Sequence, residues 1–190
     1  MLTMEKAREL VGETTTEPHL IAHATAVMAA MGGMASHFGE DVVHWQAVGY
    51  LHDYDYEQFP DEHLQHTQQP LRAAGVDEAD IRAILSHGYS ICSDVEPQTN
   101  MEKSLFTVDE LTGIISACAR MRPNGIADLE VASFMKKFKD LKFAARCNRE
   151  LIRTGCAMLG MEVRDVAAIC IDAMRPFAQQ LGLCGTGNPQ

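Results

Sequence analysis

Residues 18–37 read PHLIAHATAVMAAMGGMASH, and this stretch decides the class of fold. Its apolar side chains recur at steps of three and four residues, which is the spacing of one face of an amphipathic helix. Pro18 suits the first turn of such a helix, where its missing N–H removes no hydrogen bond. The stretch therefore predicts a helix whose buried face carries Leu20, Ala24, Val27, Met28 and Met31.

The rest of the chain repeats this helical periodicity. Sustained alternation of apolar and polar residues, the signal of a β-strand, is missing from the sequence. The polar stretch 55–70, which contains two prolines, predicts a loop with one short turn of helix. The predicted fold class is all-α, a single-domain bundle of about seven helices. Besides the first, these helices cover 40–53, 77–88, 101–119, 128–140, 143–159 and 162–182.

The length of the chain, 190 residues, suits one hydrophobic core, and its composition marks no second domain. We expect an N-terminal segment at 1–17, a helical domain at 18–182 and a flexible glycine-rich tail at 183–190. Within the domain, the candidate site residues fall in 18–118, and further helices fill 128–182.

Composition excludes several classes of function. The net charge of −10 argues against general nucleic-acid binding, which needs a basic surface. No run approaches the roughly 20 apolar residues of a membrane span. The six cysteines are scattered singly and the N-terminus has no apolar signal region, so we expect reduced thiols and a cytoplasmic protein. A homo-oligomeric assembly stays open.

Potential metal ligands recur along the chain on separate predicted segments. Imidazole and carboxylate groups drawn from several helices suit a divalent ion and leave coordination positions open for water. An apolar run, Ala47 to Leu51, leads directly into the pair His52-Asp53. A carboxylate on the apolar side of the predicted helix 101–119 is costly unless it is paired or bound to metal. The ligands, in chain order, are His23, His52, Asp53, His63, His66, His87 and Asp109.

This order resembles the HD-domain superfamily, whose pattern is His, then His-Asp, then Asp. The resemblance covers roughly residues 18–118, and the continuation FMKKFKDLKFAARCNREL is similar to a small HD subgroup of predicted hydrolases. It implies an HD-like helical fold that binds one divalent ion, either Mn, Mg, Zn, Ni or Fe. The implied ligands are His23 in HLIAHATAV, His52 and Asp53 in AVGYLHDYDYE, and Asp109 in LFTVDELTG.

In HD proteins with two metals, additional histidines lie between the His-Asp pair and the last Asp. By that resemblance, His63 and His87 would hold a second ion, with His63 preferred over its neighbour His66. Both could instead be exposed loop residues. His19 and His37 lie outside the pattern and are expected at the surface.

Each ligand of the first ion also has a structural interpretation. His23 could be a hydrogen-bonded core histidine, and the His52-Asp53 pair could cap the C-terminus of a helix. Asp109 could form a salt bridge to Arg120 or lie on an exposed helix edge. The order of all four residues favours the metal site over these alternatives.

The resemblance implies a metal-dependent phosphohydrolase that acts on a small phosphorylated or nucleotide-type substrate. The ion would lower the pKa of a bound water and polarise a phosphoryl oxygen. Asp53 would hold the ion, while His87 or Asp55 would shuttle the proton. Asp55 could alternatively fix the orientation of a ligand histidine.

A basic segment at 136–153 holds seven of the sixteen Lys and Arg residues of the chain. We expect Lys136, Lys137, Lys142 and Arg149 to contact the substrate phosphate, with a solvated helix face as the alternative. Two other functions compete with hydrolysis. One is a non-enzymatic regulatory protein that binds a metal or a nucleotide, and the other is a di-iron oxygenase of the HD type.

Overall fold

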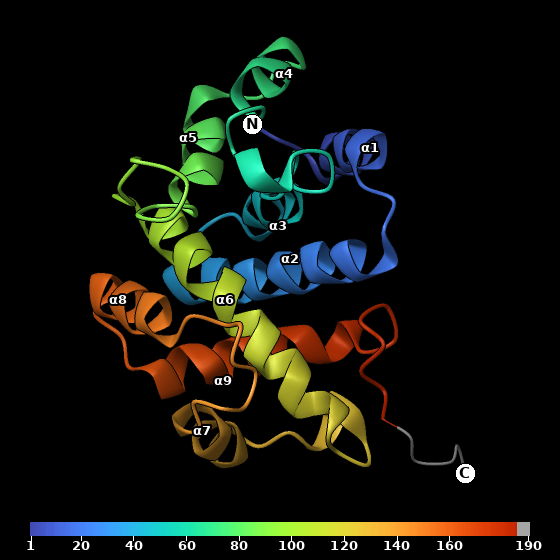
Figure 1. Ribbon diagram of the computed structural model, residues 1–190, viewed down its shortest axis with the longest axis vertical. Coiled ribbons are helices and arrows are strands. Elements are labelled where there is room, and N and C mark those ends of the chain that lie inside the picture. The colour runs from blue at the N-terminus through green and yellow to red at the C-terminus, as the bar shows by residue number, and fades with distance from the viewer. Residues whose placement is uncertain (186–190) are drawn as a thin grey trace.

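The computed structural model describes residues 1–185, and within that range the protein is an all-α single domain without strands (Figure 1). The predicted fold class is therefore confirmed. The described residues form nine α-helices rather than the expected seven, and no helix among them is both long and apolar enough to cross a bilayer. The helices are α1 Met4–Thr14, α2 Pro18–Phe38, α3 Val42–Leu51, α4 Gln68–Ala73, α5 Glu78–Ser86, α6 Asn100–Arg120, α7 Val131–Lys139, α8 Arg149–Leu159 and α9 Val163–Met174. Three short 3-10 helices are η1 Pro60–Glu62, η2 Gly125–Asp128 and η3 Arg175–Phe177.

Local sequence signals set the helix ends. Helix α2 has proline in its first turn and ends at Gly39, whose φ of 71° is left-handed and suits glycine. The side chain of Asp41 caps α3 by accepting a hydrogen bond from the backbone N–H of His44 at 3.0 Å. Thr99 and Glu102 form a capping box at the start of α6. These caps place the last residues of α3 and the middle of α6 beside α2.

Helix α2 crosses the centre of the molecule and packs against α3, α6 and α9 (Figure 1). Helices α1, α3, α4 and α5 lie on one side of it, and α7, α8 and α9 lie on the other. Helix α6 runs from one half to the other. The largest fully buried side chains of this core include Met31, Met34, Leu51, Leu105 and Ile115.

Three elements differ from the expectations. The segment 1–17 contains helix α1, capped by Thr3, which buries Leu10 and Val11 and packs against α3. The loop 55–70 runs into a further short helix, α4. Leu183, the first residue of the expected flexible tail, is instead packed on the domain, since it is 1% exposed and its carbonyl accepts the Ile126 N–H at 2.9 Å. Residues 186–190 of that tail lie outside the described residues.

Close packing of α8 on α6 requires a glycine at position 155. A Cβ atom there would overlap the side chain of Thr107. We expect Gly155→Ala to lower the free energy of unfolding by about 1–3 kcal/mol, because overpacking forces the helices apart. Urea denaturation measures this loss. The matched control is Gly12→Ala in α1, where nothing lies within 4 Å and alanine should add about 0.5–1 kcal/mol. Equal effects at both positions would contradict the packing explanation.

Candidate metal centre

Six side chains from five parts of the chain converge at one place, which we name the His/Asp cluster. Helix α2 contributes one residue from its second turn, α6 contributes one from its middle, and the others follow directly after α3, η1 and α5. Side chains at helix ends and on facing helices therefore share one small volume. The six are His23, His52, Asp53, His63, His87 and Asp109.

Asp53 lies between two pairs of imidazoles. Its Oδ2 atom is 3.5 Å from Nε2 of His23 and 3.2 Å from Nε2 of His52. Its Oδ1 atom is 3.3 Å from Nε2 of His63 and 3.5 Å from Nε2 of His87. One carboxylate thus presents one oxygen to each pair, as a ligand shared by two ions would.

Asp109 completes one side of this arrangement. Its Oδ1 atom is 2.9 Å from Nε2 of His23 and 3.5 Å from Nε2 of His52. The predicted set of four ligands therefore lies together, and we name it the first subsite: His23, His52, Asp53 and Asp109. The second subsite consists of Asp53, His63 and His87.

Hydrogen bonds fix the orientation of three imidazole rings. A ring that donates its Nδ1–H to an oxygen acceptor carries, when neutral, a lone pair on Nε2. Each of these rings therefore directs an electron pair into the cluster. The Nδ1 bonds join His52 to the Gly49 carbonyl at 2.8 Å, His87 to the Ile84 carbonyl at 2.5 Å, and His63 to Asp55 Oδ1 at 2.8 Å.

Two observations show that this donor set suits a cation. Nε2 of His52 is fully buried and makes no hydrogen bond with the described residues, although Asp53 Oδ2 lies 3.2 Å away. Nε2 of His63 and Nε2 of His87 are 3.1 Å apart, so their lone pairs face one another. A buried polar atom without a partner costs free energy unless it binds a cation or a proton. Two opposed lone pairs also cost free energy unless a cation or a proton lies between them.

The electrostatics of the cluster favour added positive charge. Burial opposes ionisation of Asp53, but the charge and hydrogen bonds of its histidine neighbours outweigh burial and hold its pKa well below the usual value. The pKa of Asp109 is lowered in the same way, by His23 and His52 against the effect of burial. Burial opposes protonation of His63, and the two carboxylates beside it raise its pKa to about 9. The two carboxylates therefore stay ionised and attract positive charge to the cluster.

Two alternative interpretations do not fit the contacts. The carboxylate of Asp109 pairs with imidazoles, and the described residues include no ion pair between it and Arg120. His66 points away from the cluster, because its Nε2 atom bonds to Glu62 at 2.6 Å and its ring stacks on Phe59. Of the two loop histidines, His63 is therefore the one that reaches Asp53.

Asp55 and His87, the two predicted proton shuttles, both form hydrogen bonds within the protein. Asp55 is 1% exposed, and it accepts hydrogen bonds from His63 Nδ1 and from the backbone N–H groups of Leu64 and His66. It holds a loop in which Leu64 has a positive φ of 69°. His87 is buried, its Nδ1 atom bonds to the Ile84 carbonyl, and its Nε2 atom faces Nε2 of His63 and Oδ1 of Asp53. Asp55 therefore orients the His63 ring, and His87 directs its Nε2 atom into the cluster.

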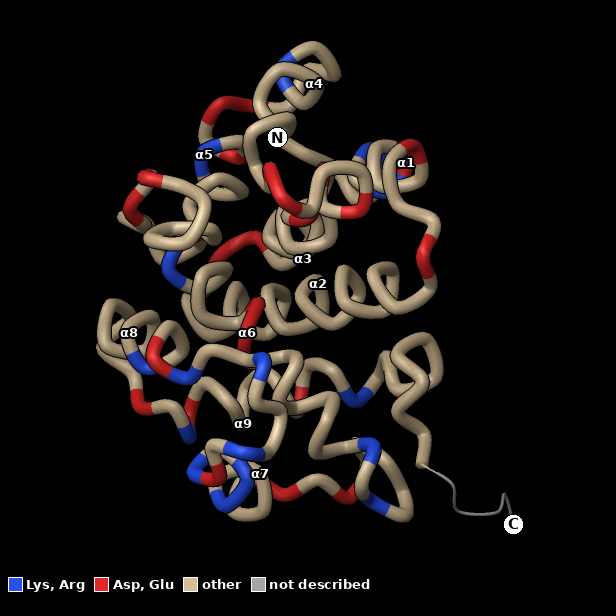
Figure 2. Tube along the Cα trace, viewed as in Figure 1, with Lys and Arg blue, Asp and Glu red and all other residues tan. Residues whose placement is uncertain are grey.

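The predicted phosphate contacts lie elsewhere. Figure 2 shows Lys and Arg gathered on α7 and the segment that leads to α8, in the half of the molecule opposite α3. Lys136 and Lys137 line a separate hollow, and Lys142 is exposed. The predicted phosphate contact is wrong for Arg149, because its buried guanidinium donates to backbone carbonyls, among them that of Phe138 at 2.9 Å. Its role is structural.

A cleft of about 340 Å³ opens beside the first subsite, and His23, Asp53 and Asp109 reach it. Three members of the first subsite are therefore accessible, whereas its fourth member, His52, and His87 of the second subsite are buried. The other residues that line the cleft are His19, Leu20, Tyr56, Glu110, Gly113 and Cys147.

Sequence reasoning missed most of this lining. His19, which was expected outside the site, lies one helical turn before His23 and so shares its face of α2. Glu110 is adjacent to a predicted ligand, but neighbouring side chains on a helix point in different directions, so adjacency did not indicate it. Cys147 comes from the segment before α8, which the backbone N–H of Asn148 ties to Glu110 at 2.8 Å. No local signal connects residues so distant in sequence.

Comparisons with protein families, curated proteins and solved structures found no match to this chain. The chemistry of the cluster follows from its own atoms. Four imidazole nitrogens and two carboxylates, open to a cleft on one side, can bind divalent ions and leave positions for small oxygen ligands.

Proposed function

We propose that the chain is a metal-dependent phosphohydrolase with two divalent ions. His23, His52, Asp53 and Asp109 hold one ion, and His63 and His87 share Asp53 to hold the other. The observation that carries this proposal is the position of Asp53, with one carboxylate oxygen facing each pair of Nε2 atoms. A partly buried carboxylate between two sets of lone pairs is the arrangement that a pair of cations stabilises.

The donor set favours some metals over others. Imidazole nitrogen suits Fe, Ni and Zn, the carboxylate oxygens suit Mn as well, and Mg prefers oxygen ligands and retains several waters. A divalent ion held here lowers the pKa of a bound water and polarises a phosphoryl oxygen. The chain itself provides the cleft: Leu20 and Tyr56 give it apolar surface, and the exposed imidazole of His19 lies at its edge. A small phosphate ester fits these features.

Hydrolysis is tested directly on the purified full chain. Phosphomonoesters, nucleotides and cyclic dinucleotides are incubated with and without Mn²⁺, and the release of phosphate or nucleotide is measured. We expect turnover of at least one substrate with Mn²⁺ and none after chelation. A protein that holds metal and binds nucleotides tightly, yet releases nothing from any of them, would be a regulatory binding protein instead.

The second subsite depends on Asp55, because its carboxylate orients His63. We expect Asp55→Asn to weaken binding of the second ion by about 10–100-fold, the usual cost of losing the partner of a metal ligand. The first ion should be retained. Metal analysis after dialysis at limiting Mn²⁺ should fall from two ions per chain to one. Asp61→Asn is the control, since this aspartate is exposed in the same loop. Equal metal content in both variants would oppose the role of Asp55.

A di-iron oxygenase is the second candidate, and the four imidazoles of the cluster favour it. Iron binds nitrogen donors well, and a shared carboxylate can hold two irons near each other. Elemental analysis of the protein as purified separates the two functions. Two irons per chain, with O₂ consumption on reduction, would support the oxygenase, whereas Mn, Zn or Ni with phosphate release supports hydrolysis.

We also propose the cytoplasm as the compartment. All six cysteines are unpaired, and burial raises the pKa of Cys118, Cys147 and Cys156 to about 11. Thiols of this kind fit a reducing environment. Fractionation of cells that express the full chain tests the assignment.

A further inference from the structure

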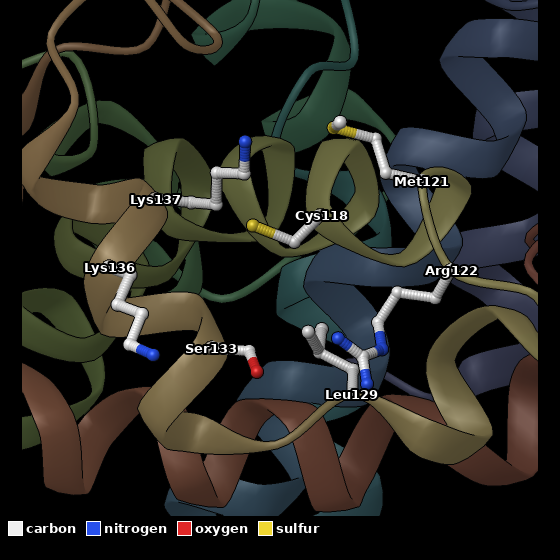
Figure 3. A pocket seen from close by; sticks show the side chains of 7 residues that line it. All are labelled: Cys118, Met121, Arg122, Leu129, Ser133, Lys136 and Lys137. Atoms are coloured by element: carbon white, nitrogen blue, oxygen red, sulfur yellow. The ribbon is translucent and has the colours of Figure 1, made fainter.

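A second hollow lies in the other half of the molecule, between the end of α6 and α7 (Figure 3). Its volume is about 290 Å³, which is enough for a small molecule. Three parts of the chain enclose it: the C-terminal turn of α6, the segment after η2 and the middle of α7. The residues that line it are Cys118, Met121, Arg122, Leu129, Ser133, Lys136 and Lys137.

The polar lining of this hollow is cationic. Figure 3 shows Lys136 and Arg122 on opposite sides, with the Ser133 hydroxyl between them. Arg122 bonds to Asp128 through Nε at 2.8 Å, which leaves its terminal nitrogens for another acceptor. Lys136 is exposed and forms no ion pair with any residue that the structure describes. Two hydrogen-bond donors with positive charge therefore face each other across the hollow.

The rest of the lining is apolar. Leu129 and Cys118 are almost completely buried and form the floor, and the thiol of Cys118 points into the hollow in Figure 3. Burial raises the pKa of this thiol to about 11, against the opposing charges of Lys137, Arg149 and Arg122. Met121, at the rim, is 63% exposed. An occupant would bury apolar surface here.

We propose that this hollow binds a small organic phosphate. Arg122, Lys136 and Ser133 contact the phosphate oxygens, and the organic part of the ligand packs on Leu129 and Met121. Three donors on different sides suit the tetrahedral oxygens of a dianion better than a flat carboxylate. The protein as a whole carries a net charge of −10, so a local concentration of cations attracts anions to this position in particular.

The proposed anion site is distinct from the His/Asp cluster. Cys118 follows Asp109 by nine residues on the same helix, which is about 14 Å along the axis at roughly 1.5 Å per residue. A ligand in the hollow therefore does not touch the metal ligands. The inference goes beyond the proposed hydrolase, and it would hold for a protein without any catalytic activity.

Binding is tested with phenylphosphonate, which cannot be hydrolysed. The full chain is labelled with ¹³C-methyl methionine, treated with a chelator and titrated while methyl resonances are recorded. We expect the Met121 resonance to shift and that of Met135 to stay, because Met135 lines a different hollow. Lys136→Glu should weaken the affinity at least tenfold. Lys142→Glu is the matched control, since it makes the same charge change at an exposed site outside the hollow and should alter affinity less than twofold.

Four results would overturn the proposal. Equal weakening by Lys136→Glu and Lys142→Glu would mean general charge attraction. Binding that requires added Mn²⁺ would place the ligand at the metal centre. Benzoate that binds as tightly as phenylphosphonate would exclude recognition of phosphate. A Met121 resonance that stays unchanged at saturation would place the ligand elsewhere.

Discussion

Replacing Asp53 with alanine is expected to remove metal from both subsites while the helices remain folded. Both oxygens of this carboxylate face imidazole nitrogens, so its loss takes one ligand from each ion. The side chain follows the end of α3 and is partly exposed to the cleft, so it contributes little to the hydrophobic core. Metal content by mass spectrometry should fall from two ions per chain to none, and phosphate release should be lost. Circular dichroism should keep its helical signal.

The control for this experiment is Asp61→Ala. Asp61 is an exposed aspartate in η1, close in sequence but outside the cluster, so its removal should leave the metal content unchanged. An Asp53→Ala protein that keeps two ions would defeat the assignment of the metal centre. A protein that keeps one ion would show that the subsites do not share this carboxylate.

Arg149→Ala should have the largest effect on stability. The guanidinium is buried and donates to five backbone carbonyls, those of Phe138, Asp140, Phe143, Ala144 and Cys147. These bonds fold the segment between α7 and α8, which has no regular structure of its own to satisfy the carbonyls. Loss of the side chain leaves one buried and four part-buried carbonyls without this donor. We expect the free energy of unfolding to fall by about 3–5 kcal/mol.

Urea denaturation measures this loss, with Arg146→Ala as the matched control. Arg146 lies in the same segment and carries the same charge, but its side chain is exposed. The control should change stability by less than about 0.5 kcal/mol, as surface substitutions usually do. Arg149→Lys should remain strongly destabilised, because an ammonium group cannot reach carbonyls on several sides. If Arg149→Ala and Arg146→Ala were equally stable, the structural role of Arg149 would be wrong.

The fold could be predicted where apolar periodicity was long. Helices α2 and α6 extend over 21 residues each, and their expected ranges agree closely with the structure. Helix α1 was treated as a terminal segment, because its packing against α3 depends on tertiary contact that a short pattern does not reveal. The predicted helix 143–159 begins only at residue 149, since Asn148 caps it and the preceding residues fold around a buried arginine.

The candidate site could be predicted as a set of residue types in order, but not as a geometry. Sequence order placed His23, the His52-Asp53 pair and Asp109 together, and the structure brings Nε2 of each of the two histidines within 3.5 Å of both carboxylates. The choice between His63 and His66 depended on the turn that Asp55 holds, which no spacing rule describes. The basic segment suggested phosphate contacts at the metal centre. Helix α7 lies in the opposite half of the molecule, and no local pattern in the sequence indicates that position.

The position of Asp53 between the two subsites also has a consequence for the order in which ions bind. The first subsite offers four protein ligands and the second offers three, one of which the two share. In the proposed two-ion centre, the first ion to arrive would fix the carboxylate in place, but its charge would repel the next cation at short range. Loading should therefore be sequential and anticooperative. A chelator of graded strength should strip the site in two separate phases, and the second subsite should empty first.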